Sequence, residues 1–272
     1  MSKINNEKYI KIKPVKPNET MSRDYYYTLE KMIKSMNKEI IDCVNDKYKK
    51  TNETINDDDN KVIASDFSVV LTFNKSIQSI LNKYIKKFSS IADTLSTSFI
   101  NQISKYTTKK LDNNIEKKTG LSIKTNKNTI SFLEKKQLQI NENVNLIKSI
   151  PEKYKEKVNI IVNQSLIQGR NLSYLNSELM KIEGMTKRRA KNISIDQLNK
   201  ATNVVNNARM EEFGITKAIW QHSGASKEPR PDHVAATGKV YDIKKGCKIS
   251  GQYIQPGQLI NCKCISVPVI EI

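Results

Sequence analysis

Apolar residues recur at helical spacing through much of the chain. The clearest pattern spans residues 77–103, where apolar side chains return every three or four positions and Lys and Ser lie between them. This spacing puts the apolar side chains on one face of an amphipathic helix, which indicates a core-facing stripe more than a partner-binding face. Similar patterns predict helices over 21–50 and 129–150. Because no proline occurs between Pro17 and Pro151, these helices have room to be long.

Polar stretches interrupt these patterns. Residues 51–60 contain an acidic run and residues 108–128 are polar with the first glycine of the chain, so both predict loops. Pro151 is expected to open a new helix that ends near Gly169, since proline is tolerated in a first helical turn.

Shorter helices are expected next. The pattern predicts one from 173 to 183, stopped by Gly184. The sequence Ser194-Ile-Asp-Gln197 resembles a capping box and predicts the start of a further helix that ends near Gly214.

The last fifty-odd residues follow a different pattern. Five glycines lie between residues 224 and 257, whereas residues 1–119 contain none. Short segments of β-forming residues at 239–241, 253–254 and 265–270 lie between these turn residues and predict strands. Pro268 has no N–H for a ladder, so we expect it on an edge strand or at a strand end. The fold class predicted is α+β: a mostly α-helical body followed by a small β-rich module.

The predicted organisation has four segments. Residues 1–20 contain two prolines and few apolar side chains, which predicts a flexible basic arm. Residues 21–150 form the helical body, 151–213 a helical segment that leads into the module, and 214–272 the β-rich module.

The net charge of +18 favours polyanionic partners, nucleic acid first. Most of this charge lies before residue 214, along the helical part. Arginine supplies only six of the 46 basic residues, which argues against base-edge recognition and favours salt-sensitive contacts with backbone phosphates. The alternative is that the positive charge reflects lysine-rich residue usage alone and not a nucleic-acid partner. No segment has the length of a transmembrane helix, and no apolar secretory signal opens the sequence.

The module concentrates residues that bind metals. His222, His233, Cys247, Cys262 and Cys264 all lie there, and Cys and His are the usual ligands of tetrahedral zinc. The preferred ligand set is His233, Cys247, Cys262 and Cys264. A zinc ion would stabilise a module too small to bury much apolar surface. In the alternative, Cys262 and Cys264 pack as small apolar side chains.

His233 also suggests a polar network, in which Asp232 orients the imidazole and Arg230 pairs with the carboxylate. A histidine beside a carboxylate can act as a general base, but no nucleophile is fixed near it by spacing, so a structural network is favoured. The only tryptophan, Trp220, is expected to anchor the module to the preceding helix. No nucleotide-binding loop or standard hydrolase motif occurs.

Five pieces of this region occur in a recognisable order: Trp220, Pro229–His233, Gly238–Tyr241, Pro256-Gly257 and Asn261–Cys264. In this order they resemble the signature of the phage Mu protein F-like family, the minor head proteins of tailed double-stranded DNA bacteriophages. The resemblance covers roughly residues 150–272. It does not reach Cys247, and the segment between Trp220 and the Pro-Arg-Pro-Asp-His sequence departs from the family pattern.

The resemblance implies a minor capsid or head morphogenesis protein. We therefore expect a structural protein and not an enzyme, found in the virion at the capsid interior or portal vertex and in the host cytoplasm during assembly. Expected partners are the portal protein, major capsid or scaffold proteins and double-stranded DNA, with no membrane and no small-molecule substrate. Two alternatives are a metal-dependent nuclease or hydrolase that uses the His/Cys module, and a nucleic-acid-binding protein outside any virion.

Overall fold

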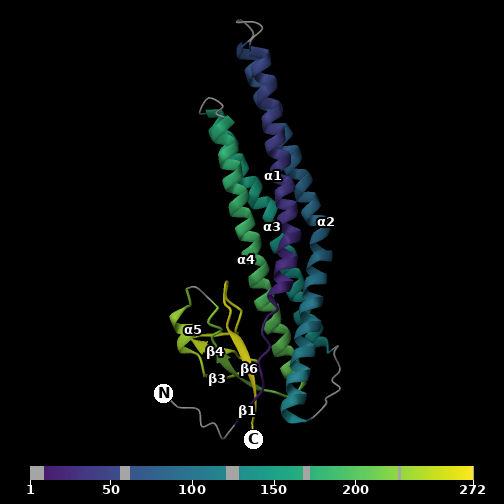
Figure 1. Cartoon of the computed structure of the whole chain (residues 1–272), viewed down its shortest axis with the longest axis vertical. Coiled ribbons are helices and arrows are strands. Elements are labelled where there is room, and N and C mark those ends of the chain that lie inside the picture. The colour runs from purple at the N-terminus through teal and green to yellow at the C-terminus, as the bar shows by residue number, and fades with distance from the viewer. Residues whose placement is uncertain (1–8, 56–61, 121–128, 168–171, 226–227, 272) are drawn as a thin grey trace. The chain divides into compact units, whose positions relative to one another are not determined.

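The computed structural model describes residues 9–55, 62–120, 129–167, 172–225 and 228–271. Long helices account for most of them, and small antiparallel strands follow (Figure 1), which confirms the predicted α+β class. None of the described helices combines the length and apolar character that crossing a bilayer requires. The long helices are α1 (Glu19–Ile55), α2 (Val62–Thr119), α3 (Ile130–Ile167) and α4 (Leu172–Glu212).

Two compact units divide the chain, and each is assembled from separated stretches. The module unit comprises the described residues of 1–24, 95–143 and 192–272. The helical unit comprises the described residues of 25–94 and 144–191. The linear segments expected from the sequence, with boundaries at 150 and 213, stay a prediction.

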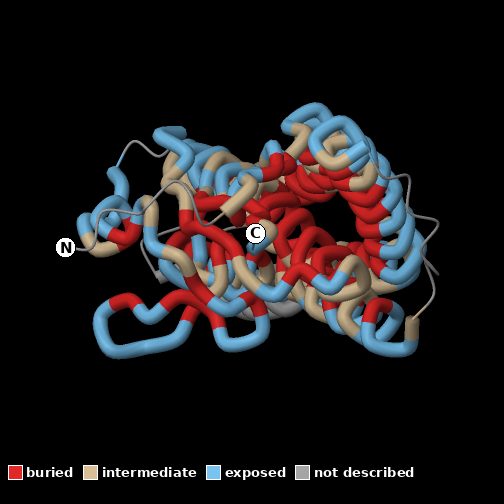
Figure 2. Tube along the Cα trace, turned by 90° about the horizontal axis from the view of Figure 1, so that it is seen from below, coloured by how far each residue is buried: buried red, intermediate tan, exposed pale blue. Residues whose placement is uncertain are grey.

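The helical unit buries one stripe from each of its four helical segments. Buried and exposed positions follow each other with helical periodicity (Figure 2), so the predicted core-facing stripes form. The innermost side chains are Leu29, Ile33, Met36 and Ile40 of α1, Ile77, Leu81, Tyr84 and Phe88 of α2, Ile147, Ile150, Tyr154 and Val158 of α3, and Leu175, Leu179 and Ile182 of α4.

The loops predicted over 51–60 and 108–128 are wrong where the structure describes them. Helix α1 continues to Ile55, and α2 continues to Thr119. The reason at α2 is that Leu111 and Ile115, one turn apart, are buried in the core of the module unit. Two apolar residues in a polar stretch are a weak local signal, but burying both stabilises the extra turns. Residues 56–61 and 121–128 lie outside the described residues.

Three predicted helix boundaries, at Pro151, Gly184 and Ser194, are also wrong. Pro151 lies inside α3, which runs unbroken to Ile167, and Gly169 lies outside the described residues. Gly184 and Ser194 both lie inside α4, so the two short helices are one. Each boundary residue weakens a helix, by about 1 kcal/mol for glycine and 3 for proline, but apolar residues buried on both sides outweigh that cost.

A four-stranded antiparallel sheet in the order β1-β6-β2-β3 forms the base of the module, beside a β4-β5 hairpin. The three predicted strands are confirmed as β3 (Val240–Asp242), β5 (Gln252–Ile254) and β6 (Ile265–Glu271). Three further strands in the described part of the chain were not predicted: β1 (Tyr9–Lys11), β2 (Lys217–Gln221) and β4 (Cys247–Ile249).

The flexible arm predicted for residues 1–20 is wrong from Tyr9 onward, while residues 1–8 lie outside the described residues. Strand β1 pairs with β6, and Ile12 and Val15 beyond it are buried. Pro268 is not at the end of its strand: it lies within β6 and pairs with Ala218 of β2, but β1 pairs only with residues 269–271, so no β1 residue pairs with Pro268. The sheet tolerates it because its carbonyl accepts the Ile12 N–H. Its missing donor therefore faces the side where β1 has already ended at Lys11.

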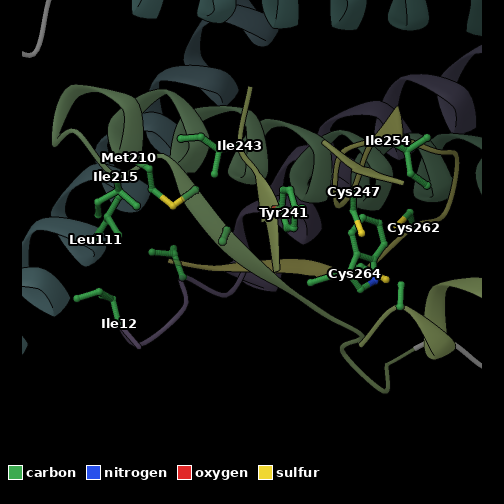
Figure 3. Packing of buried hydrophobic residues seen from close by; sticks show 14 of the residues in the cluster. Ile12, Leu111, Met210, Ile215, Tyr241, Ile243, Cys247, Ile254, Cys262 and Cys264 are labelled. Carbon is green, nitrogen blue, oxygen red and sulfur yellow. The ribbon is translucent and has the colours of Figure 1, made fainter. Parts of the chain in front are cut away.

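A single buried cluster joins the sheet and hairpin to helices α2 and α4 within the module unit (Figure 3). It contains Leu111 of α2, Met210 of α4 and Ile12, together with Trp220 of β2 and Tyr241 of β3. The β-rich residues therefore share their core with helix ends and with the N-terminal strand. Trp220 is fully buried, so its predicted anchoring role is consistent with its position.

Candidate metal centre

The loop before β6 is held tightly against α4. Gly257 adopts a φ of +74°, and a Cβ added there would lie 2.7 Å from Asn203 Nδ2 and 3.1 Å from the Asn199 carbonyl oxygen. The predicted Pro256-Gly257 turn therefore needs glycine for its conformation and for the close approach of the helix. The backbone N–H of Gly257 points at the Cys262 Sγ atom at 3.4 Å.

Two further contacts hold the end of this loop. Asn261 has a φ of +60°, a conformation that asparagine tolerates, and its N–H donates to Asp196 Oδ1 at 2.7 Å. Asn203 Nδ2 donates to the Cys264 carbonyl at 3.3 Å. Both acceptor and donor side chains come from α4, so this helix fixes the two cysteines. Asp196 and Asn203 were not predicted from the sequence, because nothing in a helical pattern shows which loop a polar side chain will contact.

The histidine comes from the short helix α5 (Pro231–Ala235), which has proline in its first turn. Contrary to the prediction, Asp232 does not orient the imidazole. Its carboxylate accepts hydrogen bonds from the His233 backbone N–H at 2.9 Å and from the Ser250 hydroxyl at 2.9 Å. Arg230 does not pair with Asp232 either, since its guanidinium donates to the Ile260 carbonyl at 3.0 Å. The predicted side-chain network is wrong, and these residues join α5 to the hairpin and loop instead.

Three predicted ligands meet. The ligand atoms of His233, Cys262 and Cys264 all lie within 4.8 Å of one another, and the three residues are 2–3% exposed. His233 Nδ1 lies 3.5 Å from the Cys262 sulfur and 3.7 Å from the Cys264 sulfur. Trp220 closes the side of the site, with its ring edge-on to the imidazole at a centroid distance of 5.2 Å and its indole N–H donating to the His233 carbonyl at 3.1 Å.

The surroundings of the site favour one thiolate. The hydrogen bond from Cys264 lowers the pKa of Cys262, and the Gly257 N–H and nearby His233 act in the same direction. The same bond raises the pKa of Cys264, because Cys264 is the donor and keeps its proton. The far ring nitrogen of His233, Nε2, is buried and has no hydrogen-bond partner in the described part of the chain.

The other predicted ligands lie elsewhere. Cys247 is buried in β4 opposite Ile254, outside the group of three, and burial raises the pKa of its thiol. It packs as a small core side chain. His222 Nδ1 accepts the Gly224 N–H at 3.2 Å, also outside the group.

The group of three fits zinc in its distances. Zn–S bonds of about 2.3 Å and Zn–N bonds of about 2.05 Å in a tetrahedron require S···N separations of about 3.6 Å. The observed 3.5 and 3.7 Å match that value. Two thiols and one imidazole are also a donor set that zinc prefers. Among the described residues a fourth ligand is not supplied. The burial of all three leaves no access for a substrate, so the arrangement suits a structural centre better than a catalytic one.

The remaining motif residues support the frame around this site. Gly238 has a φ of +90°, and its N–H donates to the Trp220 carbonyl at 2.9 Å. The Lys239 carbonyl in turn accepts the Trp220 N–H at 2.9 Å. Gly238 thus makes the turn that leads the chain from α5 back into β3 beside β2.

Comparison with known proteins places the motif residues of this site within a region of family similarity. Residues 156–267 match the family model described as Phage Mu protein F like protein, which confirms the resemblance predicted for the C-terminal part. An uncharacterized protein of Haemophilus influenzae is 27% identical over 199 residues, which are 72% of this chain and 44% of that protein. The chain thus spans less than half the length of this relative. No solved structure matches the chain.

Proposed function

We propose that this chain is a minor head protein of a tailed double-stranded DNA bacteriophage or prophage and that it acts as a structural part of the head during morphogenesis. The observation that carries the proposal is the Mu F-like match over residues 156–267, whose buried motif residues Trp220, His233, Cys262 and Cys264 lie close together in the module unit.

The proposed partners are the portal protein, major capsid or scaffold proteins, and packaged DNA through its phosphates. We propose that portal docking uses exposed apolar side chains of the long helices, such as Tyr27 and Leu138, which are 55% and 64% exposed. Tyrosine is enriched among the residues that contribute most to protein–protein binding. The protein would then act at the portal vertex or capsid interior, after assembly in the host cytoplasm.

Co-sedimentation with the cognate portal protein tests this proposal. Truncation at residue 213 is unsuitable because the removed residues share a core with Leu111 and Met210. Substitutions in the full chain avoid that problem. We expect Tyr27→Lys with Leu138→Lys to weaken co-sedimentation. The matched control, Tyr253→Lys with Ile260→Lys on the β-rich part, is expected to leave it unchanged. Failure of the unsubstituted chain to associate with portal would contradict the proposed function.

We further propose that His233, Cys262 and Cys264 hold a structural zinc ion. When bound, the ion would tie the loop before β6 to α5 and contribute on the order of 10 kcal/mol to folding. Elemental analysis of freshly purified, untagged protein tests this, with about one equivalent of zinc expected. Cys262→Ser should lose the metal and destabilise the module unit severely, whereas Cys247→Ser, a buried cysteine outside the group, should retain it. No metal in protein of native stability would mean that the cysteines are only packed side chains.

A further inference from the structure

A basic pocket lies in the module unit, away from the cysteine site. It has a volume of about 400 Å³ and is formed by residues 11–14, the last turns of α2, and β6. Four of the described residues that line it are lysines: Lys11, Lys13, Lys117 and Lys118. None of the described residues that line it carries a carboxylate side chain. The pocket therefore concentrates positive charge at one place on a chain with net charge +18.

Strand alternation accounts for two of these lysines. Ile12 points into the core and is 1% exposed, so its neighbours Lys11 and Lys13 point the other way and are exposed. The segment is held in place on both sides: the Ile12 N–H donates to the Pro268 carbonyl at 2.9 Å, and Asn114 Nδ2 donates to the Lys13 carbonyl at 2.9 Å. The backbone that carries these two charges is thus ordered before any ligand arrives.

The other two lysines belong to α2. Lys117 and Lys118 lie in its last turn, where a positive charge is favourable beside the negative end of the helix dipole. That effect explains basic residues at this helix end, but it does not explain why two more lysines face them from the N-terminal segment. Neither Lys13, Lys117 nor Lys118 forms an ion pair within the described part of the chain.

We infer that this pocket binds phosphate groups of the DNA backbone. Like charges gathered around one hollow repel each other unless an anion neutralises them. Lysine is suited to phosphate as a point charge and carries little sequence information, which fits a protein that contacts DNA of any sequence. The inference rests on the proposed function, in which the chain works beside packaged DNA, and it adds the place of contact.

Fluorescence anisotropy with a labelled, mixed-sequence duplex of about 30 base pairs tests the inference over about 50–200 mM salt. The pocket variant is Lys13→Gln, Lys117→Gln and Lys118→Gln in the full chain. The matched control is Lys31→Gln, Lys38→Gln and Lys153→Gln, which changes the charge equally at exposed positions of the helical unit. All six side chains are exposed, so both variants should fold, as circular dichroism will check.

Each phosphate contact contributes about 0.9 to the magnitude of the slope of log K against log salt concentration. For the pocket variant this slope should therefore be smaller by about 2 to 3, and its affinity for the duplex near 100 mM salt should be lower by at least about tenfold. The control should lose much less. Equal losses in both variants would overturn the pocket as the contact while leaving DNA binding in place.

Absence of binding by the unsubstituted chain at low salt would instead overturn the DNA part of the proposed function as well. Inorganic phosphate and a nucleoside triphosphate serve as further probes. Either compound could displace the duplex at millimolar concentration and also bind the unsubstituted chain, but not the pocket variant, with one-to-one stoichiometry. That result would overturn DNA as the ligand in favour of a small phosphate compound.

Discussion

The substitution Gly257→Ala tests the packing of the cysteine loop against α4. Two effects of the added methyl group destabilise the folded state. A φ of +74° costs a residue with a Cβ about 1 to 2 kcal/mol, and the 2.7 Å approach to Asn203 Nδ2 forces a shift of the kind that costs about 1 to 3 kcal/mol. Alanine also lowers the conformational entropy of the unfolded chain, and this stabilises the folded state by about 0.4 to 1 kcal/mol. The net expectation is a loss of about 1 to 4.5 kcal/mol in the free energy of unfolding.

Gly251→Ala is the matched control, because Gly251 has a φ of +81° and a Cβ there would meet nothing within 4 Å. It should show only the conformational cost, about 1 kcal/mol after the entropic return. Urea unfolding can be followed through Trp220, the only tryptophan, which is fully buried in the module unit and so reports on that unit. Equal destabilisation by the two substitutions would refute the contact with α4, since conformation alone would then explain both.

Three further outcomes follow from single contacts. Tyr154→Phe removes the hydroxyl that donates to Asn37 Oδ1 inside the helical unit, and it should lower the free energy of unfolding by about 1 to 3 kcal/mol in urea titrations. Pro151→Ala should raise the midpoint of thermal unfolding followed by circular dichroism, because a proline inside a helix costs about 3 kcal/mol; a lower midpoint would mean that the ring is needed in the core. Burial raises the pKa of the Asp196 carboxyl group, so the folded state binds the carboxyl proton more tightly than the unfolded state does. This proton binding stabilises the fold fully at a pH below the ordinary pKa of aspartate. The stabilisation is lost as the pH rises through the raised pKa. Asp196→Asn keeps an oxygen to accept the Asn261 N–H, so urea midpoints between acid and neutral pH should vary less than in the unsubstituted chain, and an unchanged pH profile would assign the effect to other carboxyl groups.

The sequence by itself determined the kinds of structure present. The periodicity of residues 77–103 encodes a helix with one buried face, and the glycine-separated β-forming segments near the end encode strands, because both signals depend on neighbours a few residues apart. The same local signals failed wherever burial decided the outcome. Leu111 and Ile115 extend α2 through a polar stretch, and the helix around Pro151 continues, because the free energy comes from side chains distant in sequence.

The candidate site divides in the same way. Residue type in the sequence predicted His233, Cys262 and Cys264 as candidate metal ligands, but it also added Cys247, which the family resemblance does not reach, since residue type does not show which atoms meet. Only the tertiary structure placed Cys247 in β4, away from the group, and gave Asp196 and Asn203 of α4 their contacts with the cysteine loop. The pocket between the N-terminal segment and the end of α2 joins residues about a hundred positions apart, and no local pattern encodes a contact over that separation.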